Sequence, residues 1–118
     1  MPIHISGTGS FIPKNKVDNN SFSDKLFFDK DGNEYPNSND EIIEKFQTIT
    51  GIKERRYANK EHKTSDLATF AARNAIKDAG IDKETIDYVI VAHNFGDIEY
   101  GTNQYIALPS VATMVKHK

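Results

Sequence analysis

The sequence contains no cysteine and no tryptophan among its 118 residues. Without cysteine, these residues can form no disulfide bond, no thiolate zinc site and no cysteine nucleophile. An excess of charge of one sign is also absent, because 15 Lys and Arg side chains stand against 17 Asp and Glu side chains. Nucleic-acid-binding proteins carry a clustered basic surface, so we expect no nucleic-acid partner.

Long hydrophobic runs are missing as well. The first ten residues, MPIHISGTGS, show no basic segment followed by an apolar stretch. We therefore expect neither a secretory signal nor a membrane-spanning helix, and a cytoplasmic protein without membrane association. Metal ligands are equally sparse, because none of the four histidines has a second histidine or a carboxylate at helical ligand spacing. These histidines are His4, His62, His93 and His117, and we expect no metal site.

The apolar residues that are present are unevenly distributed. Residues 64–93 contain fifteen apolar side chains in 30 positions, whereas residues 14–41 contain six in 28. Residues 64–93 are therefore interpreted as core and residues 14–41 as surface. The length is that of one domain, so we expect a single unit over residues 1–118.

Three helices are predicted. The first is capped by Asn39 or Asp40, presents apolar residues on one face and ends at Gly51. The second begins at Thr64–Asp66, with a capping oxygen from Thr64 or Ser65, and ends at Gly80. Its many alanines predict close packing against a neighbouring element. The third is a short helix with Pro109 in its first turn.

Three segments predict strands. Residues 2–9 alternate apolar and polar residues before a Gly7-Thr8-Gly9 turn, residues 52–58 form an exposed or edge strand, and residues 86–92 form a β-branched run typical of strands buried on both faces. The order of strand, helix and buried strand indicates an α/β fold. A phosphate-binding role of the two glycines is disfavoured, because the third glycine of such a motif is missing.

Residues 26–35 predict a β-hairpin, because apolar residues flank an Asp-Gly pair. A calcium loop is the alternative, with Asp29, Asp31, Asn33 and Asp40 at positions 1, 3, 5 and 12. Position 6 is not the glycine that such a loop requires, so the hairpin is favoured and calcium binding is not expected.

Few residues indicate catalysis. No nucleophile elbow and no phosphate-binding loop is present. His93 follows the predicted buried strand, at the sheet edge where α/β proteins bind ligands, and a structural role is the favoured interpretation. Asp97 and Glu99 lie in the next loop and are interpreted as solvated.

Several short motifs together resemble a known family. They are Gly7–Pro13 (GTGSFIP), Gly51–Ala58 (GIKERRYA), Thr64–Ala68 (TSDLA), Ala79–Asp82 leading into Ile86–Ala92, and Pro109–Ala112 (PSVA). In this order and at these spacings they are similar to the N-terminal portion of the β-ketoacyl-acyl-carrier-protein synthase III family, within the thiolase-like superfamily. The resemblance implies an incomplete thiolase-like α/β fold, the N-terminal part of its first half, with helices packed on a mixed sheet and a hairpin-like insertion at about 17–39.

The resemblance also implies an activity for a longer protein. Such an enzyme is a homodimeric acyltransferase of fatty-acid or related lipid biosynthesis, which joins an acyl primer to malonyl-acyl-carrier protein with loss of carbon dioxide. Its partners would be acyl carrier protein and an acyl thioester, with no other cofactor. The catalytic Cys, His and Asn are expected beyond Lys118, so the chain alone is predicted to be inactive.

One substrate-binding residue carries over. The residue before Pro-Ser in the family forms the floor of the partner's acyl pocket, and here it is Leu108. An ordinary interface or core leucine is the alternative. The family also stacks the coenzyme A adenine between a Trp and an Arg before Gly-Ile, but residues 40–50 contain neither, so coenzyme A stays open as the carrier. The insertion at 17–39 and the loop at 94–107 exceed the family pattern.

A second class of function remains compatible with the sequence. The same pattern is expected of a noncatalytic α/β module that binds other proteins, because a fold does not determine a function.

Overall fold

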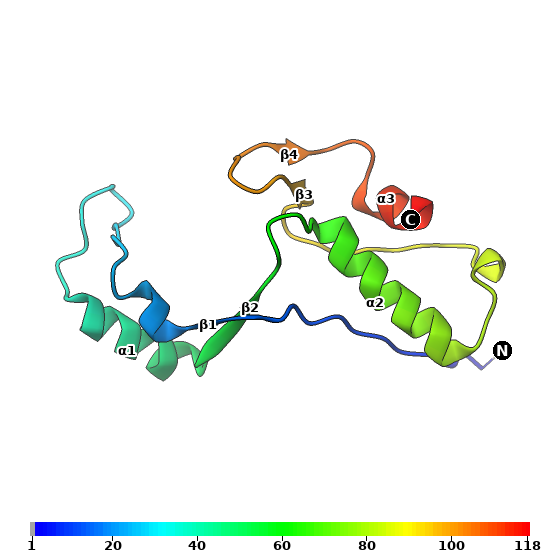
Figure 1. Ribbon diagram of the computed structural model, residues 1–118, viewed down its shortest axis with the longest axis horizontal. Helices are drawn as coiled ribbons and strands as arrows, with labels where there is room; N and C mark the ends of the chain where they lie inside the picture. Colours follow the sequence, from blue (N-terminus) through cyan, green and yellow to red (C-terminus); the bar gives the residue numbers. More distant parts are fainter. Residues whose placement is uncertain (1) are drawn as a thin grey trace. The chain divides into compact units, whose positions relative to one another are not determined.

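The computed structural model describes residues 2–118. The chain divides into two compact units. Lys14–Tyr57 form one unit, called the α1 unit below, and the described residues up to Pro13 together with Ala58–Lys118 form the other, called the α2 unit. Figure 1 shows the elements of each unit. That residues 1–118 act as a single domain stays a prediction.

The α1 unit is built on a two-stranded antiparallel sheet. Strand β1 (Asn15–Asp18) pairs with β2 (Glu54–Tyr57). Strand β2 confirms the strand expected within residues 52–58, whereas β1 lies in a segment interpreted as surface and was not predicted. A 3-10 helix, η1 (Asn19–Phe22), follows β1 directly. The sequence of β1 gives little indication of a strand, because Val17 is its single apolar residue and is only half-buried.

The buried side chain of Asn19, in η1, bonds to Arg55 of β2 and to the segment before β2. Asn19 is 7% exposed, donates from Nδ2 to the Ile52 carbonyl over 2.9 Å and accepts from Arg55 Nη1 over 2.7 Å. The Arg55 guanidinium lies 5.6 Å from the ring centres of both Phe22 and Phe46. Hydrogen bonds and cation–π contacts therefore hold β2 against η1 and against the helix at residues 39–50, which contains Phe46.

Helix α1 (Asn39–Thr50) forms where it was predicted and ends at Gly51, whose φ of 69° places it in the left-handed region. The N-cap differs from the expected residue, because Ser38 rather than Asn39 or Asp40 accepts from the Glu41 amide. The Asn39 side chain instead donates to two carbonyl oxygens of the preceding segment. The buried apolar residue of the helix is Ile42.

The predicted hairpin is present as a tight turn with one antiparallel bridge, Phe28 to Glu34. Gly32 adopts φ 84°, which explains the glycine in the Asp-Gly pair. The Asp29 carboxylate accepts the amides of Asp31 and Asn33 over 2.8 and 2.9 Å. These hydrogen bonds, that of Asn33 first, hold the pKa of Asp29 below its ordinary 3.8. The carboxylate thus stabilises the turn as an acceptor of backbone amides.

The α2 unit is organised around α2 (Thr64–Ala79), which ends at Gly80 as predicted. The N-terminal segment runs along this helix (Figure 1). A Cβ atom on Gly7 would lie 2.5 Å from the Ala79 nitrogen, and one on Gly9 would lie 2.2 Å from the Ala75 nitrogen. The alanines of α2 therefore do permit a close approach, and the two glycines meet them.

The expectation of a strand and a turn within residues 2–9 is wrong. These residues form no strand, and neither Gly7 nor Gly9 has a positive φ. No described segment pairs with them as a sheet neighbour, and their backbone is bonded by side chains of α2 instead. The Thr8 amide donates to Asp78 over 2.9 Å, and the Ser10 carbonyl accepts from Asn74 over 2.9 Å. The Thr8 amide therefore already has a carboxylate acceptor.

The expectation of a buried strand at residues 86–92 is also wrong for the described part of the chain. The segment follows a 3-10 helix, η2 (Lys83–Thr85), and is neither helix nor strand. Tyr88 and Ile90 are 85% and 92% exposed. A strand needs a hydrogen-bonded neighbour, and no segment within residues 2–118 supplies one.

The last helix, α3 (Val111–His117), begins two residues after Pro109, with Ser110 as its N-cap. Val111 and Val115 are buried, and α3 contacts α2. The loop before it contains an unpredicted hairpin of β3 (Asp97–Ile98) and β4 (Tyr105–Ile106). Both sheets among residues 2–118 are two-stranded and antiparallel, so the chain mixes helix and strand, but the mixed sheet under the helices is not formed by these residues.

In the described part of the chain, no helix combines the length and the apolar character needed to cross a membrane.

Candidate functional site

A buried polar cluster lies at the N-terminal end of α2. Asp97 is 3% exposed and Ser65 is fully buried. The Ser65 amide donates to Asp97 Oδ1 and its hydroxyl to Oδ2, each over 2.7 Å, while Thr64 donates to the Gly96 carbonyl over 2.6 Å. Asp97 is therefore not the solvated loop residue expected above. Its burial is tolerated because the carboxylate accepts a hydrogen bond from the Ser65 amide, which has no partner within the helix, and because negative charge is stabilised at a helix N-terminus.

Two further charges complete this cluster. The Lys118 ammonium donates to the Ser65 hydroxyl over 3.2 Å and forms an ion pair with Asp66. Asp66 also accepts from the Lys63 amide over 2.8 Å. Desolvation is the largest influence on the pKa of Asp66 and raises it, but Lys118, the Lys63 amide and His62 together bring the pKa below the ordinary 3.8. Asp66 thus supplies the predicted negative charge at this helix end.

We interpret the cluster as a structural one that stabilises the fold. Among residues 2–118, no buried side-chain nitrogen or oxygen lacks a hydrogen-bond partner. The Ser65 hydroxyl is fully buried and is bonded to the Asp97 carboxylate and the Lys118 ammonium, so it is not exposed to a substrate. The cluster therefore acts as a clamp between α2 and the β3–β4 hairpin. The sequence identified Thr64–Asp66 as a helix start, but it did not identify their partners Gly96, Asp97 and Lys118, which are distant in sequence.

His93 lies at the base of the same hairpin. Its Nδ1 accepts from the Gly96 amide over 2.9 Å, which closes a short turn before β3. This contact gives the histidine the structural role that the sequence favoured. Within the described residues, no group of three or more His, Cys, Asp or Glu side chains is arranged to hold a metal ion.

Leu108 follows β4 and precedes α3, and it is 84% exposed. The side chain is thus not part of a core formed by residues 2–118. Its role at the floor of an acyl pocket stays a prediction, and the exposure leaves it accessible for such a contact.

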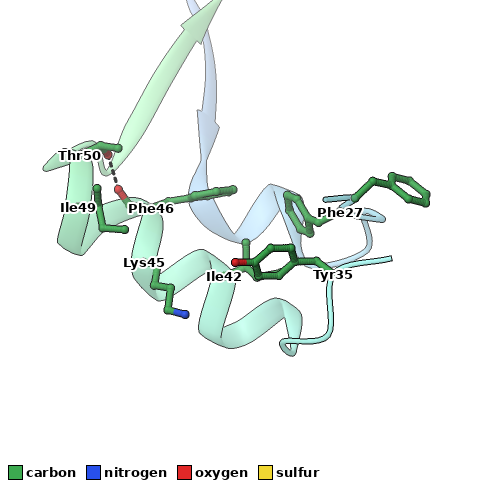
Figure 2. A pocket seen from close by; sticks show the side chains of 8 residues that line it. Phe27, Tyr35, Ile42, Lys45, Phe46, Ile49 and Thr50 are labelled. Carbon is green, nitrogen blue, oxygen red and sulfur yellow. Dashed lines mark hydrogen bonds between the residues drawn. The ribbon is translucent and has the colours of Figure 1, made fainter. Parts of the chain in front are cut away.

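An apolar cleft lies on α1 (Figure 2) and has a volume of about 300 Å³. One wall comes from α1 and the other from the hairpin before it. The lining residues are Phe27, Phe28, Tyr35, Ile42, Lys45, Phe46, Ile49 and Thr50. The rings of Phe27 and Phe46 meet edge to face at 5.7 Å, and the Thr50 hydroxyl bonds to the Phe46 carbonyl. The cleft was not predicted, because its residues were assigned separately to a β-hairpin and to a helix.

A second cleft of about 560 Å³ lies in the α2 unit, between α2, the segment from Lys83 to Ile90, and α3. Its wall includes the exposed side chains of Tyr88 and Ile90. The cleft is therefore bordered by the apolar run that has no strand partner among residues 2–118.

No protein-family model matches the chain. Curated proteins do match it. A protein of Staphylococcus haemolyticus is 40% identical over 118 residues, which cover 100% of this chain and 31% of the relative. Proteins of Neisseria meningitidis serogroup C and Paracoccus denitrificans are 40% and 38% identical over 114 and 112 residues, covering 97% and 95% of this chain and 29% and 28% of the relatives. All three are named β-ketoacyl-[acyl-carrier-protein] synthase III. The chain therefore spans about a third of the length of these relatives.

Proposed function

Because this chain is homologous along its whole length to the N-terminal portion of β-ketoacyl-[acyl-carrier-protein] synthase III proteins, we propose that it is part of a condensing acyltransferase of fatty-acid or related lipid biosynthesis. The identity of 40% over all 118 residues is the observation that carries this proposal. The proposal includes an incomplete thiolase-like fold, a homodimer and a cytoplasmic location.

The proposed reaction has two steps. A cysteine thiolate first attacks the carbonyl carbon of an acyl thioester, which forms an acyl-enzyme thioester and releases the carrier thiol. Malonyl-acyl-carrier protein then loses carbon dioxide, and the resulting carbanion attacks the acyl-enzyme. A carbon–carbon bond forms, and the cysteine leaves as thiolate. Groups that polarise the malonyl carbonyl lower the barrier of this second step.

The amino-acid composition indicates which roles this chain can have in the longer protein. The chain has no cysteine, so it cannot supply the nucleophile. We assign the catalytic Cys, His and Asn to the two thirds of the relatives' length that this chain does not span. The chain itself would supply scaffold and substrate contacts. Acyl carrier protein and an acyl thioester, of coenzyme A or of another carrier, are the proposed partners of the longer protein.

A comparison of two proteins tests this assignment. The complete gene product and the 118-residue chain are each incubated with an acyl thioester and malonyl-acyl-carrier protein, and release of carbon dioxide and formation of 3-oxoacyl product are measured. We expect turnover by a gene product that contains the cysteine and none by the chain alone. Turnover by the 118 residues would refute the assignment, and a complete gene product without condensing activity would favour the noncatalytic binding module.

The proposed role of Leu108 has its own test. In the longer protein, Leu108→Phe should shorten the range of acyl primers, because a larger side chain fills the pocket floor. Primers of increasing length are compared by kcat/KM, with Leu26→Phe as control, since Leu26 is also largely exposed at 67%. An unchanged length profile would leave Leu108 as an ordinary surface or interface residue.

A further inference from the structure

The cleft on α1 has a wall that is unusually apolar for an accessible surface. Phe28, Tyr35 and Ile49 border it and are 59%, 44% and 78% exposed. Exposed apolar side chains scattered singly are common, but these three converge on one concavity with Phe27 and Phe46. Ligand sites share this composition, a mostly apolar and aromatic lining with a few polar groups.

Two polar groups at this cleft are available to a ligand. Within residues 2–118, the Lys45 ammonium takes part in no ion pair or hydrogen bond, and the Tyr35 hydroxyl in no hydrogen bond. Figure 2 shows the Tyr35 hydroxyl directed from the hairpin wall across the cleft toward α1. The nearby Glu41 carboxylate is engaged by the Asn37 amide over 2.7 Å rather than by Lys45. One cation and one hydroxyl donor therefore border an apolar wall.

We propose that this cleft binds an aliphatic carboxylate, whose chain lies against the aromatic wall and whose head group is bound by Lys45 with Tyr35. The volume of about 300 Å³ accommodates about ten non-hydrogen atoms at roughly 30 Å³ each, as in a liquid. A medium-length fatty acid matches that size. The test of this site requires no turnover.

Calorimetric titration of the full chain at neutral pH, followed by NMR shift mapping, measures this binding. Decanoate carries the anionic head, and 1-decanol is the uncharged match. We expect decanoate to bind about twofold to fivefold more tightly than decanol, the range of an exposed ion pair. Shifts should be confined to α1 and residues 27–35.

Three variants separate head-group from chain recognition. Lys45→Met should remove the preference for decanoate over decanol, and Tyr35→Phe should weaken decanoate while sparing decanol. Ile49→Asp should weaken the binding of both ligands, and because Ile49 is largely exposed the substitution should leave the chain folded. Lys14→Met, at an exposed lysine that does not line the cleft, is the matched control and should change nothing.

The source of the carboxylate is distinguished by a third ligand. S-decanoyl phosphopantetheine carries the same chain, but its anion is far from the acyl carbonyl, so we expect it to lose the contribution of Lys45 and to bind like decanol. Equal affinity for decanoate and decanol in the unaltered chain would overturn the proposal. So would an absence of binding by either ligand, or shifts located outside the cleft.

Discussion

Two regions of the α2 unit contrast sharply. At the N-terminal end of α2, the charged Asp97 and the polar Ser65 are buried. In the apolar, β-branched run at residues 86–92, Tyr88 and Ile90 are almost fully exposed. Burial in this chain therefore follows the availability of partners rather than the hydrophobicity of the residues. Asp97 has two donors at a helix end, whereas the apolar run has no strand beside it within residues 2–118.

The contrast depends most on Asp97. Replacing it with alanine leaves the Ser65 amide and hydroxyl buried without their acceptor, and we expect a loss of about 2–4 kcal/mol in the free energy of unfolding. Urea unfolding followed by circular dichroism measures this change. Glu99→Ala, in the same hairpin but exposed, is the control and should cost less than about 0.5 kcal/mol. Equal effects of the two substitutions would show that the cluster does not stabilise the fold.

The packing of the N-terminal segment on α2 should give the next largest effect. Gly9→Ala would place a Cβ atom 2.2 Å from the Ala75 nitrogen, a backbone atom that cannot rotate away. Such overpacking costs about 1–3 kcal/mol. Amide hydrogen exchange of residues 2–13 should report faster opening of this segment. Thr8→Ala retains the backbone donor to Asp78 and is the control; faster exchange there as well would contradict a glycine-specific contact.

A smaller effect is expected from the pH dependence of Asp66. Its pKa is lowered in the folded chain, so its ionised form is favoured by folding above the ordinary 3.8, and this contribution is lost as the pH falls through the folded pKa. The stability difference between the unaltered chain and Asp66→Asn should therefore shrink as the pH is lowered from about 5 to below 3.8. Unfolding curves across that range test this, and a difference that grows on acidification would contradict the assigned direction.

The sequence predicted the parts of this fold that rest on local signals. The helix at 64–79 was recognisable from its start, its alanine stripe and Gly80, and the turn at residues 29–33 from its Asp-Gly pair. Strand β1 and the β3–β4 hairpin were missed because they are short and poor in alternation. The strands expected at 2–9 and 86–92 failed because strand formation requires a partner that periodicity cannot supply.

The candidate sites were harder to predict for a related reason. Ser65 and Asp97 lie 32 residues apart, and only the folded chain places the carboxylate at the helix end. The cleft on α1 likewise joins a hairpin and a helix that were assigned separately. Leu108 was available only through a family resemblance, since nothing in its local sequence marks a binding residue.

The smallest expected effect sharpens the comparison further. Ile90→Ser in the 118-residue chain should change the free energy of unfolding by less than about 0.5 kcal/mol, because the side chain is already 92% exposed. Val115→Ala, at a buried position of α3, is the matched contrast and should cost more. In the longer protein that we propose, we expect residues 86–92 to pair as a strand and the rest of the chain to pack over Ile90, and the same serine substitution should then cost about 2–5 kcal/mol. Equal, negligible costs in both proteins would mean that Ile90 stays exposed in the longer protein as well, and the expected burial of residues 86–92 would be wrong.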